Sequence, residues 1–252
     1  MWLLAVSAHA AGWTQPAGGW FVKAGYRAVP GAGARLADGS FAETRPFVDH
    51  AAQVYAELGV TDAWTAVLTG APLGYAVYDA QATLYTGPTL VGLRRALGTG
   101  AVRTAAELRI GGAPPVGAVD LDPTEGLYQP TVAGGLIDGE LQLGTSLGDG
   151  WLSLSAGVRG HTALHPAALG MAQVGRAWDH LVLDVHVPVH WSFAVDTVNV
   201  TGAGDTQYVG LGLGLSWWFG ERAGVQTGFD GGPVARANAA APSLPLALLL
   251  RG

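Results

Sequence analysis

Apolar and polar residues alternate along most of this chain, in stretches of about ten positions separated by turn residues. The clearest stretch covers 181–191. One of its faces holds Leu181, Leu183, Val185, Val187, Val189 and Trp191, and the other holds Val182, Asp184, His186, Pro188 and His190. Successive side chains of a β-strand point to opposite sides of a sheet, so this period of two predicts strands with one apolar and one polar face.

The same alternation recurs often enough to predict an all-β chain with no helix of any length. The predicted strands are 18–29, 47–60, 63–77, 85–97, 101–111, 137–148, 150–160, 179–189, 191–200, 207–219, 222–230 and 241–251. These twelve strands make an even number, as in bacterial single-chain transmembrane barrels. The predicted fold is therefore a closed antiparallel transmembrane β-barrel of about 12 strands.

The predicted connections alternate between short and long. The short ones are 61–62, 98–100, 149–150 and 220–222, and the longer ones are 30–46, 78–86, 112–136, 161–178, 201–206 and 231–240. Outer-membrane barrels show this asymmetry, with short periplasmic turns and longer extracellular loops. The turn predicted near 188–192 differs from the others in lacking glycine.

Composition narrows the choice of environment. Apolar residues make up 49% of the chain and charged residues 13%, whereas a soluble domain carries about 25% charged residues. Glycine and polar residues interrupt every apolar stretch after the N-terminus, so no apolar run reaches the length of about 18 that a membrane helix needs. A closed barrel is the other backbone that satisfies its hydrogen bonds in lipid. A glycine-rich soluble β-sandwich is the structural alternative.

Charge and cysteine content exclude further classes. The net charge of −6 and the lack of a basic run argue against nucleic acid as a partner. The chain has no cysteine, which excludes disulfides and cysteine-ligated metals. We predict no cofactor and no metal.

The N-terminus resembles an export signal. Ala8-His9-Ala10 follows a short apolar stretch and fits a small-residue cleavage site. Residues 1–10 are therefore predicted as a signal peptide and residues 11–252 as the barrel. The basic segment that opens a signal peptide is missing, which favours a true start upstream of Met1. The alternative is an apolar N-terminal strand.

Tryptophans gather beside the predicted short turns and termini. The membrane-interface candidates are Trp20, Trp64, Trp191 and Trp217. Tryptophan favours the lipid–water interface because its ring is apolar and its N–H needs a partner. The pattern predicts an aromatic girdle at one rim, in contact with outer-membrane lipid. Trp151 has the wrong parity for the lipid face, which indicates a bulge or an inward ring there.

If the apolar face meets lipid, the polar face lines the barrel interior. The lumen-lining or binding candidates are Lys23, Arg27, Gln53, Glu57, Arg103, Glu107, Arg109, Glu140, Gln142, Arg159, Asp184, His186 and His190. Both charge signs occur, so these side chains either form a rigid structural network or line a polar path or binding site for a solute. Width grows with strand number, and twelve strands leave room for a narrow lumen unless a loop plugs it.

Signals for catalysis are few. His186 and His190 share a strand face but lie about 13 Å apart by the rise per residue, too far to ligate one ion. The pair His190 and Ser192 resembles the His-x-Ser pair of outer-membrane phospholipases, although here the register turns both residues inward. The chain is not predicted to be an enzyme, and lipid hydrolysis is kept as an alternative. The glycines Gly210, Gly212 and Gly214 lie within a strand, where they relieve crowding and bind no nucleotide.

The first third of the chain resembles the barrel family named for the meta-cleavage pathway of phenol degradation. The resemblance rests on Gly12-Trp-Thr-Gln-Pro-Ala-Gly-Gly-Trp-Phe-Val-Lys-Ala-Gly-Tyr26 and on Tyr55-x-Glu57-x-Gly-Val-Thr-Asp62-x-Trp-Thr, followed by a strand ending in Ala-Pro72. It implies an outer-membrane barrel that transports hydrophobic or aromatic compounds. Two features depart from the family: the end Leu-Leu-Leu-Arg-Gly252 lacks the terminal aromatic residue, and segment 112–136 has no counterpart.

We therefore expect an outer-membrane protein that acts as a passive channel or binding barrel for small hydrophobic or aromatic solutes. Its other expected partner is the barrel-assembly machinery. One alternative is a structural or adhesive barrel with a plugged lumen, whose loops 30–46 and 112–136 meet a partner. A lipid-acting enzyme is the second alternative.

Overall fold

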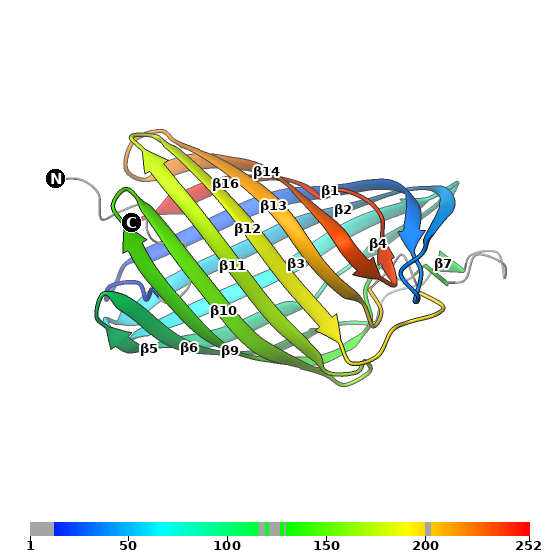
Figure 1. Cartoon of the computed structure of the whole chain (residues 1–252), viewed down its shortest axis with the longest axis horizontal. Helices are drawn as coiled ribbons and strands as arrows, with labels where there is room; N and C mark the ends of the chain where they lie inside the picture. Colours follow the sequence, from blue (N-terminus) through cyan, green and yellow to red (C-terminus); the bar gives the residue numbers. More distant parts are fainter. Residues whose placement is uncertain (1–12, 116–118, 121–126, 129, 200–202) are drawn as a thin grey trace.

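A computed structural model describes residues 13–115, 119–120, 127–128, 130–199 and 203–252 as one closed β-barrel (Figure 1). The predicted signal peptide, 1–10, lies outside the described residues. No helix in the described part of the chain is long and apolar enough to cross a membrane.

Twelve strands form the barrel wall. They are β1 (Trp20–Arg35), β2 (Phe41–Thr61), β3 (Trp64–Tyr78), β5 (Thr89–Thr99), β6 (Val102–Ala113), β9 (Gly134–Leu147), β10 (Gly150–His161), β11 (Ala167–Trp178), β12 (Leu181–Ser192), β13 (Gln207–Trp218), β14 (Ala223–Arg236) and β16 (Leu244–Arg251). Each pairs antiparallel with the next wall strand, and β1 pairs with both β2 and β16, which closes the sheet. The predicted fold class is confirmed.

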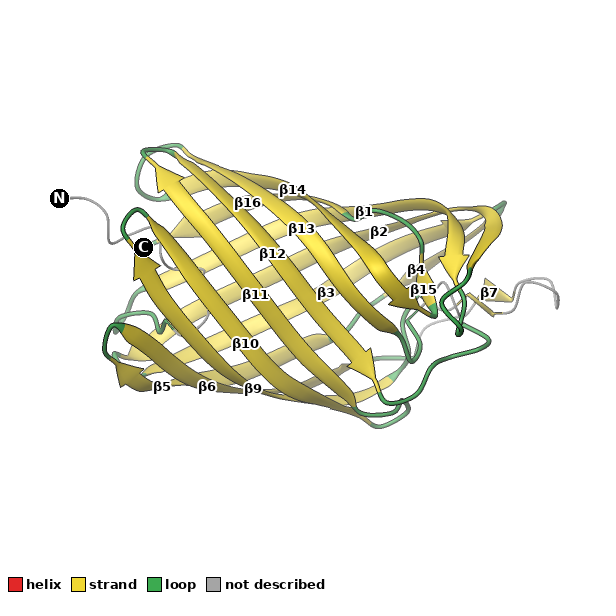
Figure 2. Ribbon diagram, in the orientation of Figure 1, coloured by secondary structure: helices red, strands yellow, loops and turns green. Residues whose placement is uncertain are grey.

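Four further short strands lie outside the set of twelve, two paired with wall strands and two paired with each other. They are β4 (Gln81–Tyr85), which pairs with β3, β15 (Asn238–Ala239), which pairs with β1, and the separate pair of β7 (Val119–Asp120) and β8 (Leu127–Tyr128). All of them lie away from the chain termini, at the other end of the barrel (Figure 2).

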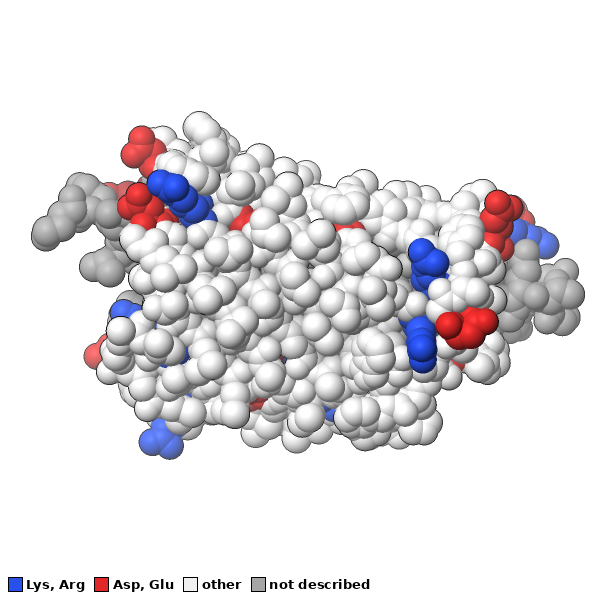
Figure 3. Space-filling view, viewed as in Figure 1, with Lys and Arg blue, Asp and Glu red and all other residues white. Residues whose placement is uncertain are grey.

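The barrel is apolar outside and polar inside. Leu58, Leu141 and Leu246 are 51%, 62% and 58% exposed, whereas Glu57 and Asp138 are only 4% and 1% exposed. This inverts the arrangement of a water-soluble protein, which buries large apolar residues and exposes most of its charged ones. On the face drawn in Figure 3, most Lys, Arg, Asp and Glu atoms lie towards the two ends, and the broad belt between them shows only a few charged atoms. Such a surface suits a hydrocarbon solvent.

Short turns and long connections lie at opposite ends of the barrel. Five turns, at 62–63, 100–101, 148–149, 179–180 and 219–222, form what we call the short-turn end, where the C-terminus also lies (Figure 1). The opposite long-loop end carries the remaining connections. The predicted loop 30–46 is mostly strand, because β1 and β2 continue as a hairpin that turns only at 36–40.

Two errors in the predicted strand list compensate for each other. The predicted connection 161–178 contains β11, whose alternation is weak because it is rich in alanine and glycine. The predicted strands 179–189 and 191–200 are instead the single strand β12, followed by a connection. Pro188 caused the second error: proline donates no hydrogen bond, and the β12–β13 pairing is interrupted there while the strand continues.

Candidate functional site

The structure places all thirteen predicted lumen residues on the inner face of the wall. The strand registers decide this, because each residue pairs across strands with other inward residues and alternates with the exposed apolar set. Their location inside the barrel follows, while a role in binding a solute stays a prediction.

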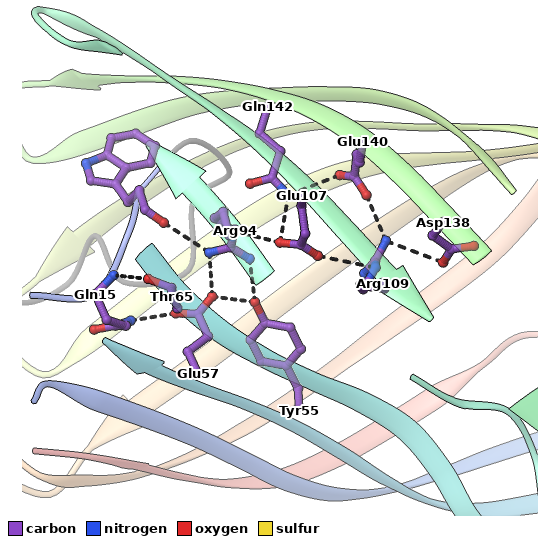
Figure 4. A network of polar contacts seen from close by, with 11 residues as sticks. Gln15, Tyr55, Glu57, Thr65, Arg94, Glu107, Arg109, Asp138, Glu140 and Gln142 are labelled. Carbon is purple, nitrogen blue, oxygen red and sulfur yellow. Dashed lines mark hydrogen bonds and ion pairs between the residues drawn. The ribbon is translucent and has the colours of Figure 1, made fainter. Parts of the chain in front are cut away.

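Arg94 is the centre of a buried ion network near the short-turn end (Figure 4). Its guanidinium lies 2.7 Å from a carboxylate oxygen of Glu57 and 2.7 Å from one of Glu107. It also donates to the hydroxyl of Tyr55 at 2.9 Å and to the carbonyl of Trp13 at 3.0 Å. The planar guanidinium presents five donors, so one arginine satisfies four acceptors from separate parts of the chain.

The network continues along the inner faces of β6, β9 and β10. Arg109 lies 3.2 Å from Glu107, 2.9 Å from Glu140 and 3.6 Å from Asp138. Arg159 forms a two-point contact with the same Asp138, at 2.8 and 2.7 Å. Both signs alternate along this wall, as the structural-network interpretation of the sequence expects.

Residues 13–19, which we call the N-terminal plug, enter the lumen at the short-turn end. The Gln15 backbone N–H donates to Thr65 Oγ1 at 2.9 Å, and the Gln15 side chain donates to Glu57 at 2.5 Å (Figure 4). The plug is also tied to the β2–β3 turn, since Ala17 N–H donates to Asp62 at 3.0 Å. The sequence pattern anticipated a plug from a loop, whereas the plug observed here is the segment before β1.

An apolar cluster closes the same end of the lumen beside the plug. It consists of Trp13, Phe21, Trp151, Ala177, Val182, Trp218, Ala247 and Leu249, all buried. Arg251 lies over the Trp218 ring at 4.1 Å and Arg103 over the Trp13 ring at 5.8 Å. Trp151 therefore points inward, which explains why its position in the alternation did not fit the lipid face. Plug and cluster both lie in the lumen at the short-turn end.

The opposite wall is lined by glycine and a second polar cluster. His186 lies 2.9 Å from Asp184 and 2.5 Å from Asp230. A side chain at Gly212 would collide with His186 and Asp230, and one at Gly214 would collide with Asp184. The β13 glycines thus make room for side chains that lie across the strand, which confirms their predicted role.

A cavity of about 600 Å³ lies beside the second polar cluster in the long-loop half of the lumen, lined mainly by β1, β2, β12, β13 and β14. Phe47, Tyr85 and Tyr208 contribute aromatic surface to its lining, and Lys23 and Gln53 contribute polar groups. In this lining Arg27 pairs with Asp49 at 2.7 Å and His186 pairs with Asp230, whereas Lys23 has no ion pair among the described residues. The size of the cavity suits a small organic molecule.

Several residues of the site were not singled out in the sequence. Arg94 lies at an inward position of β5, next to the exposed Leu93 and in alternation with Val91. The adjacent Arg95 puts a charged residue at an outward position too, so the sequence does not show which arginine faces the lumen. Asp138 and Asp230 lie at the ends of predicted strands, where parity is hard to assign. Trp13 and Gln15 precede the first predicted strand, and no periodic pattern marks them.

Four tryptophans lie on the outside of the barrel at the short-turn end. Trp20, Trp64 and Trp217 lie there as predicted, and Trp178 joins them; all four are exposed. Arginines cover two of these rings, since Arg95 lies over Trp64 at 5.3 Å and Arg176 lies over Trp178 at 5.2 Å. This pairing of tryptophan with a cation suits a lipid–water interface.

Trp191 was predicted for the same rim, and this was wrong. It lies at the end of β12 remote from turn 179–180, and it pairs with Ala168 and Gln207 at the long-loop end. The cause is the turn predicted near Pro188, where the strand in fact continues. Trp191 still faces outward, so it belongs to the opposite rim.

His190 and Ser192 do not form a catalytic pair. The His190 ring stacks on Tyr208 with 5.7 Å between ring centroids. The buried Ser192 donates to Asp205 at 2.8 Å, and Asp205 also accepts from His165 at 2.7 Å. Burial raises the pKa of the Asp205 carboxyl, but the hydrogen bonds from His165 and Ser192 outweigh it and hold that pKa below its usual range. The Ser192 hydroxyl thus fastens the connection after β12.

We expect the double variant His190→Ala with Ser192→Ala to release fatty acid from phospholipid vesicles at the same rate as the unaltered protein, at background. The group against the Ser192 hydroxyl is the Asp205 carboxylate, whose pKa lies below its usual range, so it is too weak a base to activate that hydroxyl. Titration of released fatty acid measures this. Hydrolysis by the unaltered protein that the double variant loses would contradict the assignment.

Comparison with known proteins adds support for the fold. No protein-family model matches the sequence, and no curated protein matches it. Among solved structures, the chain is similar to the COG4313 outer membrane channel from Pseudomonas putida F1, with a TM-score of 0.71 and 11% identity over 96% of this chain and 98% of that one. It is also similar to the translocator domain of the autotransporter NalP from Neisseria meningitidis, with a TM-score of 0.50 and 14% identity over 93% and 88% of the two chains. The chain has the closed antiparallel fold of outer-membrane β-barrels.

Proposed function

We propose that this protein is an outer-membrane barrel that binds small, neutral, hydrophobic or aromatic solutes in its lumen and admits them from the long-loop end. The cavity of about 600 Å³ above the N-terminal plug carries the proposal. Aromatic side chains line it, and four of its five Lys, Arg, His and Asp side chains are paired with one another, Arg27 with Asp49 and His186 with Asp230. A neutral aromatic solute can contact the rings there without having to separate these ion pairs.

The outer surface supports the membrane location. The exposed residues of the strands are mainly leucine and valine, and a ring of tryptophan with arginine marks the short-turn end. Short turns face the periplasm in barrels of this kind, so we place the N-terminal plug on the periplasmic side. The resemblance of the first third to the phenol-degradation family supports the solute class, and the outer membrane channel named in the structural comparison supports a channel in general.

Tyr208→Ala tests the cavity. Tyr208 lies in the lining, and an aromatic contact contributes about 0.5–1.5 kcal/mol beyond its area. We therefore expect the dissociation constant of a small neutral aromatic such as indole to rise roughly 2- to 10-fold in isothermal titration of the detergent-solubilised protein. Tyr75→Ala is the matched control, because Tyr75 is exposed on the outer face. Equal affinity in the unaltered protein and Tyr208→Ala would contradict the assignment of the binding site.

The plug supports a second candidate, a structural barrel with a closed lumen. Residues of the plug make several hydrogen bonds to the wall, and the apolar cluster packs beside them. A structural barrel would bind no indole and would not speed the entry of any solute into liposomes. The same titration, together with liposome swelling, separates the two functions.

A further inference from the structure

A groove of about 580 Å³ lies on the outer surface near the short-turn end, over β10, β11 and β12. Among its lining residues, Leu147, Val174 and Val185 are outward-facing side chains that are 58%, 49% and 38% exposed. Leu183 faces the same way, because it pairs with the outward Arg176. The groove is therefore apolar along most of its length and open to the lipid.

Glycine explains why the surface is hollowed here. Gly150 lies between Leu147 on β9 and Arg176 on β11, its cross-strand partners. A Cβ at this position would lie 2.6 Å from the Gly175 carbonyl oxygen, so the backbone approach requires glycine. Without a side chain at this outward position, a space remains between the leucine and the arginine.

An arginine and an aspartate lie together at the end of the groove. Arg176 is on β11, and Asp149 is in the turn before β10. The closest nitrogen and oxygen of the two side chains are 3.9 Å apart, and the side chains are 59% and 49% exposed. A charge-assisted hydrogen bond is about 2.7–2.9 Å long, so this ion pair has none. Within the described part of the chain, neither side chain makes another hydrogen bond, and both can therefore bind a ligand.

The two charges are nevertheless held side by side. The Arg176 guanidinium lies over the Trp178 ring at 5.2 Å, which fixes it on the outer face. The Asp149 carbonyl accepts a hydrogen bond from the Ala177 N–H at 3.0 Å, which ties the turn to β11. The positive and the negative group are thus positioned by the fold and not by each other.

Arg95 shows that this arrangement is more than an interfacial arginine on a tryptophan. It lies over Trp64 at 5.3 Å, at the same end of the barrel and on the same outer surface. Arg95 has no ion pair with a carboxylate among the described residues, and it does not line the groove. The acid and the apolar groove are what distinguish Arg176.

We propose that Arg176, Asp149 and the groove bind one phospholipid whose headgroup carries a phosphodiester and a primary ammonium, as in phosphatidylethanolamine. The guanidinium can take two phosphate oxygens through parallel N–H bonds, and the carboxylate can accept from the ammonium. One acyl chain then lies along Leu147, Val174 and Leu183. Separation of the exposed ion pair costs little, because such pairs contribute little to stability. The inference uses the membrane orientation given under the proposed function, and it does not depend on the lumen cavity.

The headgroup chemistry predicts a preference among lipids. Phosphatidylcholine has the same two charges, but its trimethylammonium has no N–H to donate to Asp149. Phosphatidylglycerol has the phosphodiester without the cation, and it leaves the carboxylate beside an uncompensated negative charge. The arginine should therefore set the affinity for all three lipids, and the aspartate should set the preference for the primary ammonium.

Native mass spectrometry of the detergent-solubilised protein tests the site, with these three lipids added in turn at increasing concentration and with identical acyl chains. We expect one molecule of phosphatidylethanolamine to bind several-fold more tightly than the other two. Asp149→Asn should remove this preference. Arg176→Gln should weaken all three lipids roughly tenfold, because the charge-assisted bonds to phosphate are lost. Glu221→Gln, in another turn at the same end, and Arg95→Gln are the matched controls and should change neither quantity.

Heat-modifiable electrophoretic mobility confirms that each variant is folded. Equal binding of the three lipids by the unaltered protein, or an unchanged preference in Asp149→Asn, would mean annular lipid only and would overturn the site. A dimer that Arg176→Gln dissociates would overturn it in favour of a second copy of this chain on the groove. Any of these results leaves the proposed function standing if the protein binds indole, whereas absence of indole binding overturns that function without touching the lipid site.

Discussion

Deletion of residues 13–17 is expected to raise the single-channel conductance of the barrel several-fold in planar lipid bilayers. Ion flow needs a continuous water path, and the buried Trp13 and Gln15 occupy that path at the short-turn end. Without them the carboxylate of Glu57 and the guanidinium of Arg94 lose partners from the plug and become accessible to water. A polar surface then replaces part of the plug at this end of the lumen.

Trp178→Ala is the control for this deletion. Trp178 lies at the same end of the barrel, but on its outer face. We expect its removal to leave conductance unchanged. If the deletion variant keeps its heat-modifiable mobility and conducts no better than the unaltered protein, the plug does not limit passage, and the neighbouring Trp151 and Trp218 become the candidates for the obstruction.

The fold could be predicted from the sequence because the period of two reports directly on a wall with lipid on one side. The prediction from this alternation succeeded where large apolar residues occupy every second position, as in β12 and β13. It failed in β11, because alanine and glycine give little contrast between faces. The predicted number of strands was still twelve, because dividing β12 at Pro188 added one strand and missing β11 removed one.

The sequence pattern predicted which side chains of the candidate site point into the lumen. It did not predict which of them pair with one another. Parity placed Glu57, Glu107 and Arg109 inside, but pairing depends on strand register and on which strands are neighbours. Arg94 contacts Glu57 from across β3, a relation that no local pattern contains. The plug has no periodic pattern in the sequence. Its residues are held by single hydrogen bonds to the wall and not by a strand ladder that would impose an alternation.

The largest expected effect on stability is that of Arg94→Met. Arg94 and its partners Glu57 and Glu107 are all buried, and their side chains are 7%, 2% and 1% exposed. Removing one partner from a buried ion pair leaves an uncompensated charge and costs about 3–5 kcal/mol. We expect the free energy of unfolding to fall by about that amount. Urea titration of the barrel in lipid vesicles, followed by tryptophan fluorescence, measures it.

Arg95→Met is the matched control, because the next residue along β5 points outward and contacts only the Trp64 ring among the interactions described for it. An exposed cation–π contact contributes about 0.5–1 kcal/mol, so the two neighbouring arginines should differ several-fold in their effect. The reason can be tested further by adding Glu57→Gln to Arg94→Met. Glutamine keeps the shape of the side chain and removes the uncompensated charge, so part of the lost free energy should return. Effects of the two substitutions that simply add would instead mean that Arg94 stabilises the barrel by packing and not by its charge.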